Sequence, residues 1–180
     1  MIKDQDLLNL LLSDKTKEQG FSKLVSEYKE RLYWHIRNIV KSHDDADDVL
    51  QDTFVKVYKN LSSFKGESKL FSWMYRIATN EALTFINRKS KMMQITNEEV
   101  MELAVRNLQS DTFFDGDETQ LKLQKAIAKL PEKQQLVFNM RYFQEMKYKD
   151  MSEILDTSEG ALKASYHIAV KKIEDDLEKN

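Results

Sequence analysis

The chain has 180 residues, of which 41% are apolar and 32% charged, and its formal net charge is −2. This composition is that of a globular protein with enough apolar material for one or two domains. The lack of cysteine excludes disulfide bonds, thiolate metal sites and a cysteine nucleophile. The first 20 residues hold only a short apolar run interrupted by acids, so we expect neither a signal peptide nor a membrane span there.

Three amphipathic helices are predicted in the first half of the chain, and the single proline and four glycines favour long helices. Apolar residues recur at helical spacing over residues 21–39, 46–61 and 70–86. Three such stripes can share one core, as in a small helical bundle. The stripes therefore serve packing, and function is to be sought on the polar faces.

The second of these helices carries an acidic face. Its polar residues away from the core are Asp45, Asp48, Gln51, Asp52 and Lys56. Carboxylates at a helix start offset the N-terminal dipole, which explains the first acids but not those deeper in the helix. A metal site is disfavoured, because carboxylates at this spacing splay around a helix and do not converge on one ion. We interpret the face as a contact surface.

The third helix carries a polar stripe formed by Trp73, Arg76, Asn80, Thr84 and Asn87. Helical spacing keeps these residues on one face. An aromatic ring, a guanidinium and amides are the groups that stack on bases and bond their edges. A solvated face with Trp73 half buried at its edge explains the same pattern, so this helix alone leaves both interpretations open.

An acidic connector over residues 92–120 separates two mildly basic blocks. The net charge is +3 for residues 1–91, −6 for residues 92–120 and +1 for residues 121–180. The connector's acids are Glu98, Glu99, Glu102, Asp111, Asp115, Asp117 and Glu118. A short helix fits residues 97–108, and the simplest interpretation of the whole segment is a solvated linker. The blocks could then lie far apart or pack on each other.

The C-terminal block predicts a helix-turn-helix. Two helices are expected on either side of Pro131, followed by a short amphipathic helix over residues 148–155. The turn begins at Asp156, which tolerates a left-handed conformation, and Ser158 is a good N-cap for the next helix. That longer helix turns Leu162, Tyr166, Ala169, Ile173 and Leu177 inward. A short helix, a tight turn and a longer helix are typical of DNA-binding modules.

The outward face of this last helix suits a major groove. It carries Gly160, Lys163, Ala164, His167, Ile168 and Lys171. Small residues near its start permit close approach, the lysines can meet phosphates, and the isoleucine can touch a thymine methyl. Since the helix ends in acids, only its first half suits DNA.

With both blocks in view, the chain resembles the extracytoplasmic-function (ECF) class of bacterial sigma factors, in the sigma-70 superfamily. The resemblance is carried by DADDVLQDTFVKVYKNL, FKGESKLFSWMYRIATNEALTFINRK and LPEKQQLVFNMRYFQEMKYKDMSEILDTSEGALKASYHIAVKKI, in this order. It implies an all-α fold in which an N-terminal helical bundle (sigma region 2, residues 1–91) is joined by the acidic linker to a C-terminal helix-turn-helix domain (sigma region 4, residues 121–180).

The resemblance also assigns roles by position. It implies that the acidic helix docks on core RNA polymerase through Asp45, Asp48, Gln51, Asp52 and Phe54. It implies contacts with −10 DNA from a base-capturing loop and the third helix, namely Phe64, Gly66, Glu67, Ser68, Trp73, Arg76, Asn80 and Arg88. It implies contacts with −35 DNA from Arg141, Lys163, Ala164, His167, Ile168 and Lys171.

The function implied is that of a sigma factor, which binds core RNA polymerase, recognises the −10 and −35 elements and helps to open the −10 region. Such a protein is not an enzyme, and no cofactor or metal is expected. The implied partners are core polymerase and promoter DNA, with an anti-sigma factor as a further partner in many members of the class. The implied location is the cytoplasm, without membrane insertion. The −35 helix has lysines but no arginine, which predicts an unusual −35 preference and weak binding to DNA without polymerase.

Two other interpretations remain. A helix-turn-helix regulator with an N-terminal sensor or dimerisation domain would bind a palindromic operator as a homodimer. It gives no reason for the acidic face or for the stripe of the third helix. A helical enzyme would use the acids of residues 44–48 with a divalent ion, although their spacing disfavours one.

Overall fold

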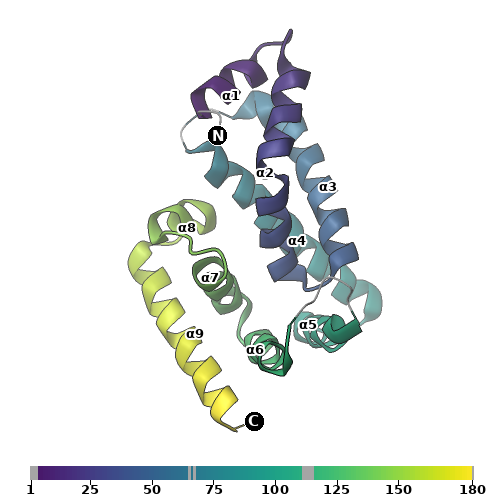
Figure 1. Ribbon diagram of the computed structural model, residues 1–180, viewed down its shortest axis with the longest axis vertical. Helices are drawn as coiled ribbons and strands as arrows, with labels where there is room; N and C mark the ends of the chain where they lie inside the picture. The colour runs from purple at the N-terminus through teal and green to yellow at the C-terminus, as the bar shows by residue number, and fades with distance from the viewer. Residues whose placement is uncertain (1–3, 65, 67, 111–115, 180) are drawn as a thin grey trace.

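The computed structural model describes residues 4–64, 66, 68–110 and 116–179, and within them every regular element is helical. The N-terminal half holds α1 (Asp4–Leu12), α2 (Lys17–Val40), α3 (His43–Asn60), the 3-10 turn η1 (Leu61–Ser63) and α4 (Leu70–Met93) (Figure 1). Next come α5 (Asn97–Arg106) and η2 (Asn107–Ser110). The C-terminal half holds α6 (Glu118–Ala128), α7 (Glu132–Tyr142), α8 (Tyr148–Leu155) and α9 (Glu159–Lys179). The predicted all-α fold is confirmed.

The N-terminal half is a bundle in which α2, α3 and α4 pack against one another. Its core is built from the three predicted apolar stripes, including Leu32 and Ile36 of α2, Val57 of α3 and Met74 and Ala78 of α4, all without exposed surface. Burial of such side chains is the main stabilising contribution to a bundle of this size. All three helices are longer than their apolar stripes: α2 and α3 begin before them, and α4 continues to Met93.

Helix α1 was not predicted, and it packs along α2 through the buried side chains of Leu7 and Leu11. The two helices lie close together at Gly20, where an added Cβ would lie 2.9 Å from the carbonyl carbon of Leu10. The hydroxyl of Thr16 donates to the Leu10 carbonyl oxygen at 2.9 Å. The absence of a side chain at position 20 therefore lets α1 close over the bundle.

A tight connection places the acidic helix α3 directly after α2. Lys41 adopts a left-handed conformation (φ 62°) at the end of α2, and Ser42 caps α3 by accepting from the backbone N–H of Asp45 at 3.4 Å. Asp44 and Asp45 lie in the first turn of α3, where carboxylates complement the helix dipole.

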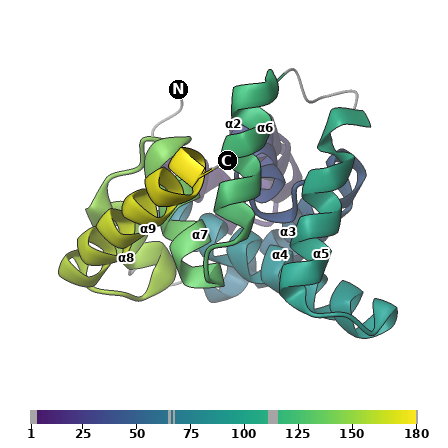
Figure 2. The same cartoon turned by 90° about the horizontal axis from the view of Figure 1, so that it is seen from below.

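The connector is helical over residues 97–108, where a short helix fits the sequence, so the interpretation of the whole segment as a solvated linker is wrong there. Helix α5 begins with a capping box in which Thr96 and Glu99 bond each other's backbone N–H groups. Its apolar face is buried through Val100, Met101 and Val105. Figure 2 shows α5 and α6 side by side, and α5 also packs on α4. Asp111 and Asp115 lie outside the described residues.

The C-terminal half forms the predicted helix-turn-helix. Asp156 takes the left-handed conformation (φ 50°) that ends α8, and the Ser158 hydroxyl accepts from the backbone N–H of Ala161 at 3.3 Å. Leu162, Ala169 and Ile173 of α9 are buried as expected, whereas Leu177 is 37% exposed. The turn residues thus set the direction of α9 across α6 and α7.

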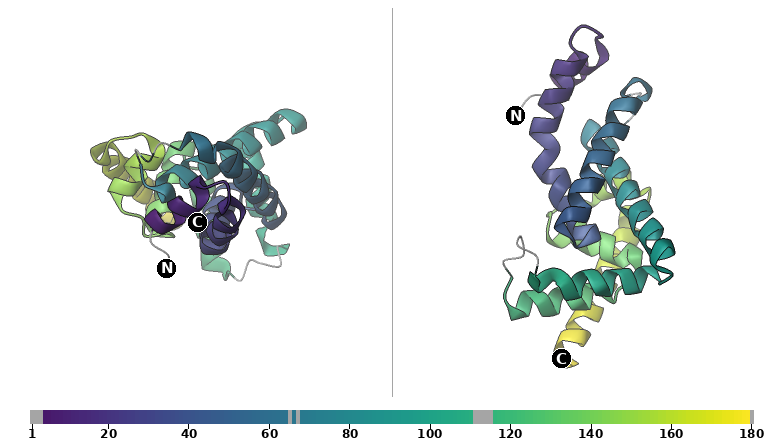
Figure 3. Two further views of the ribbon diagram at one scale, coloured as in Figure 1. Left: turned by 90° about the horizontal axis from the view of Figure 1, so that it is seen from above. Right: turned by 90° about the vertical axis from the view of Figure 1, so that its right-hand side faces the viewer.

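The two halves pack on each other. Helix α8 lies against α4 and α7 against α2, and Figure 3 shows α5 and α6 across the lower end of the bundle. Leu136 and Met140 of α7 and Met151 of α8 belong to the same buried cluster as the N-terminal core. Of the two arrangements that the sequence left open, the structure has the packed one.

Candidate functional site

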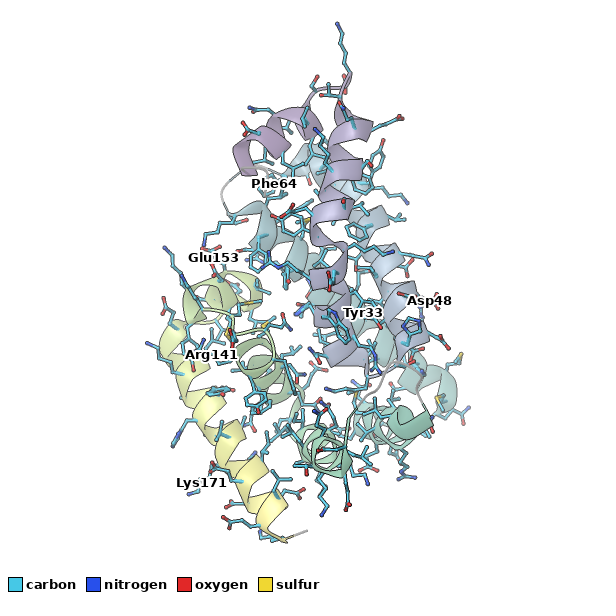
Figure 4. All side chains as sticks on the ribbon, in the orientation of Figure 1. Tyr33, Asp48, Phe64, Arg141, Glu153 and Lys171 are labelled. Carbon is cyan, nitrogen blue, oxygen red and sulfur yellow. The ribbon has the colours of Figure 1, made fainter. Side chains whose placement is uncertain are left out.

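The acidic face of α3 is exposed over its middle turns. Asp48, Gln51 and Asp52 all point to solvent, and Figure 4 shows Asp48 at the edge of the molecule. Asp45 instead forms a 2.5 Å ion pair with Lys89 of α4. The half-buried ring of Phe54 meets Phe21 edge-on, with centroids 6.3 Å apart. Three of the five residues predicted to contact a protein partner are thus available, and the other two are engaged within the bundle.

The loop before α4 brings two predicted residues together. The Phe64 ring packs on the Trp73 indole with centroids 5.1 Å apart, and both side chains are half buried. Gly66 adopts φ 72°, a conformation that favours glycine, and its Cα is open to solvent. Ser68 is half buried. Glu67 lies outside the described residues.

The α4 stripe is on the surface beyond Trp73. Arg76, Asn80 and Arg88 are exposed, and the Arg88 guanidinium lies 5.6 Å from the centre of the Phe85 ring. Trp73 is half buried, as the solvated-face interpretation also expected. Exposed guanidinium and amide groups leave the stripe chemically able to bond a nucleic acid.

Helix α8 covers the start of this stripe with acidic side chains. Asp150 forms a 2.6 Å ion pair with Lys69, and Glu153 accepts a hydrogen bond from the Ser72 hydroxyl at 2.7 Å. The Arg76 guanidinium donates to the backbone carbonyl of Glu153. Figure 4 shows Glu153 on the side of α8 that faces the bundle. Next to this contact lies a cleft of about 680 Å³, whose lining includes Asn80 of α4 and Leu162 of α9.

The outward face of α9 is free of such cover. Lys163, Ala164, His167, Ile168 and Lys171 are all exposed. The ammonium of Lys163 lies 5.6 Å from the centre of the Tyr148 ring. The structure therefore brings these five predicted residues together on one helix surface.

Arg141, the sixth residue of that prediction, is half buried and holds the loop between α7 and α8. Its guanidinium donates to the Met146 carbonyl oxygen at 3.1 Å and lies 5.3 Å from the centre of the Tyr148 ring. These contacts give Arg141 a structural task at the entrance of the helix-turn-helix.

Two buried basic groups, for which the sequence predicts no role, lie where the halves meet. His35 is fully buried, with Nε2 2.8 Å from the Thr79 hydroxyl and Nδ1 within hydrogen-bond distance of the Gln144 amide. Burial lowers the pKa of His35 from 6.5 to about 4, against the smaller opposing effect of Gln144. Its spacing from Leu32 and Ile39 already put it on the apolar stripe of α2.

Lys41 is 3% exposed, and its ammonium donates to Oε1 of Gln124 on α6 at 2.7 Å. Burial, and then the charge of Arg37, lower the pKa of Lys41 from 10.5 to about 7. The interface between the halves thus contains two basic side chains, His35 and Lys41, and the hydrogen-bond partners of both include an uncharged glutamine amide.

The described residues contain no cluster of three or more His, Asp or Glu side chains able to hold a metal ion. In the same part of the chain, no helix has the length and apolar character needed to cross a membrane.

Comparison with known proteins accounts for both halves. Residues 24–92 match the family model of Sigma-70 region 2, and residues 120–173 match that of Sigma-70, region 4. The ECF RNA polymerase sigma-E factor of Haemophilus influenzae is 28% identical over 171 residues, which cover 89% of each chain.

Two solved structures share the fold. CnrH, solved in complex with the cytosolic domain of CnrY, aligns with a TM-score of 0.72 at 20% identity over 98% of both chains. The sigma factor RpoE of Bartonella quintana, solved with the anti-sigma factor NepR, aligns with a TM-score of 0.66 at 18% identity, over 89% of this chain and 98% of the other.

Proposed function

The chain belongs to the sigma-70 family of RNA polymerase sigma factors, in its extracytoplasmic-function class, and from this premise we propose which of its surfaces meet polymerase and promoter. It directs RNA polymerase to promoters and is not an enzyme. The observation that carries the proposal is the order of the two matched regions together with the separate surfaces on α3, α4 and α9.

The α3 face is the proposed docking surface for core polymerase. Asp48, Gln51 and Asp52 would meet basic groups on the polymerase, and such contacts favour rapid, salt-dependent association. Asp45 contributes less, because its carboxylate is already paired with Lys89. Phe54 supports the face from inside by packing on Phe21.

The loop after η1 and the α4 stripe form the proposed −10 surface. The Phe64 and Trp73 rings offer a stacking platform for an extruded base, and Gly66 leaves room beside it. Arg76, Asn80 and Arg88 would bond the strand along α4. Glu67 stays a candidate from the sequence alone.

The α9 face is the proposed −35 surface. The residues that would contact the −35 element are Lys163, Ala164, His167, Ile168 and Lys171. We retain Arg141 only as a positioning residue for the helix-turn-helix, because its guanidinium is occupied by Met146 and Tyr148.

In the packed arrangement these surfaces differ in access. The α3 and α9 faces are exposed, while Asp150 and Glu153 of α8 occupy Lys69, Ser72 and Arg76 at the start of the −10 surface. Reading the −10 element therefore requires α8 to leave α4. We propose that docking on polymerase separates the halves, and that the protein acts in the cytoplasm. An anti-sigma factor is a further proposed partner, because the similar RpoE structure contains one.

A promoter assay with core polymerase tests the proposal. Initiation from a defined start only when the chain is added is the expected result. Asp48→Lys with Asp52→Lys should abolish initiation without unfolding the bundle, and a change at Asn80 should alter the preferred −10 bases. Tight operator binding by the free protein, without polymerase-dependent initiation, would overturn it in favour of a conventional regulator.

A further inference from the structure

Trp34 of α2 exposes 48% of its surface, although it lies next to the fully buried His35. A half-exposed tryptophan keeps a large apolar area in contact with water, which folding normally avoids. Its ring meets the Tyr33 ring edge-on, with centroids 5.2 Å apart. The indole therefore stands on a fixed aromatic support and faces outward.

That support ties Trp34 to the start of the acidic helix. The Tyr33 hydroxyl lies 2.8 Å from Nδ1 of His43, the first residue of α3, and Nε2 of His43 lies 3.6 Å from the Asp47 carboxylate. Figure 4 shows Tyr33 and Asp48 at the same level of the neighbouring helices α2 and α3. The exposed indole is thus linked, through Tyr33 and His43, to the first turns of the helix that carries the proposed polymerase surface.

The acidic face has an apolar residue at its other end too. Val55, one turn beyond Asp52, is 50% exposed. The docking surface therefore combines exposed carboxylates with two exposed apolar side chains, Trp34 on α2 and Val55 on α3. A helix that carries basic residues in its middle and aliphatic stems along its length is complementary to such a surface, since lysine and arginine present both.

We propose that Trp34 is the main apolar anchor of the polymerase docking surface, packing on a basic amphipathic element of core polymerase. This inference rests on the proposed function and deepens it. Trp34 and the carboxylates of α3 would affect different rates of binding. Fully desolvated aromatic side chains dominate interface energies and slow dissociation, whereas exposed charges mainly speed association. An arginine of the partner would also be attracted to the indole face.

The test measures association and dissociation rates of the full chain with core polymerase. Trp34→Ala should weaken binding about 30-fold, mostly through faster dissociation, as for an interface hot spot. Trp34→Phe keeps a ring on Tyr33 and should restore most of the affinity. Leu12→Ala, which truncates a side chain that is 60% exposed on α1, is the matched control and should bind like the wild type. Thermal unfolding of all variants shows whether the bundle is intact.

The outcomes separate this inference from the function on which it rests. If Asp48→Lys with Asp52→Lys abolishes binding but Trp34→Ala behaves like Leu12→Ala, the anchor is wrong and the docking surface stands. If the free protein dimerises and Trp34→Ala makes it monomeric without changing polymerase binding, the indole covers a second copy, and the inference is overturned. If core polymerase binds none of these proteins, the proposed function itself fails.

Discussion

Nδ1 of His35 lies 3.1 Å from Nε2 of Gln144, which links α2 to the loop after α7 across 109 positions of the chain. The hydroxyl of Thr79 donates to the Tyr75 carbonyl oxygen at 2.8 Å, so its oxygen is left to accept from Nε2–H of His35. Nδ1 then accepts from Nε2–H of Gln144 while the imidazole is neutral, and it can donate to Oε1 of Gln144, 3.2 Å away, once it is protonated, which is how Gln144 opposes the lowering of the pKa. The network thus fits a neutral imidazole, in agreement with the low pKa of this residue.

Stability should therefore fall in mild acid. The pKa of His35 is about 4 in the folded protein and 6.5 when exposed, so the unfolded chain binds more protons between these values. The contribution of neutral His35 is complete above pH 6.5 and is lost as the pH falls toward 4. Urea unfolding of wild type and His35→Gln should show a difference that varies with pH only in this window. A constant difference would mean that His35 does not titrate there.

Lys41 predicts a second pH range, on the alkaline side, in which the free energy of unfolding changes with pH. Its pKa of about 7 in the folded protein lies below the ordinary 10.5, so stability should rise with pH between these values, by at most about 1.4 kcal/mol per pH unit. Lys41→Met removes the charge that must be desolvated. We expect this variant to be the more stable one at pH 7, and to lose its advantage as the pH approaches 10. Equal pH profiles would show that the amine is solvated.

The acids of α8 should compete with the −10 strand. Asp150→Asn with Glu153→Gln removes the negative charges that face Lys69 and Ser72 and leaves only neutral amide acceptors there. Exposed ion pairs contribute about 0–1 kcal/mol, so a gain of a few fold in affinity for −10 single-stranded DNA is expected, largest at low salt. Fluorescence anisotropy with a labelled strand measures it. Asp175→Asn with Glu178→Gln, at the far end of α9, makes the same change of two units in net charge and is the control, and an equal gain there would refute the competition.

The capping box of α5 provides a test of the folded connector. Thr96→Ala removes the side chain that caps α5 and should lower the free energy of unfolding by about 1 kcal/mol. Thr84→Ala, exposed in the middle of α4, should change it far less. If the connector were a solvated linker, the two substitutions would be equivalent in a denaturant titration.

The sequence predicted what depends on local patterns. The stripes of α2, α3 and α4, the left-handed Asp156 and the Ser158 cap all follow from spacing and turn chemistry, and the structure has them. Whole-chain packing was beyond such patterns. The pairing of Asp45 with Lys89 depends on how α3 meets α4, and the occupation of Arg76 by α8 depends on how the halves meet. A short helix fitted residues 97–108, but the burial of Val100 and Val105 depends on how α5 packs on α4 and α6. The roles of the surface residues remain predictions.

The two glycines of α2 and α9 give a matched pair for the packing of α1. At Gly20 an added Cβ would lie 2.9 Å from both the carbonyl carbon and the Cβ of Leu10, so Gly20→Ala must push α1 away from the bundle. Displacing α1 exposes Leu7 and Leu11, and a loss of about 1–3 kcal/mol is expected, as for an overpacked core. At Gly160 no atom lies within 4 Å of an added Cβ. Gly160→Ala should therefore stabilise the protein by about 0.5–1 kcal/mol, because alanine loses less backbone entropy in a helix. Opposite shifts in the thermal midpoint are the expected outcome, and a Gly20→Ala variant as stable as the wild type would show that α1 does not pack on α2 in solution.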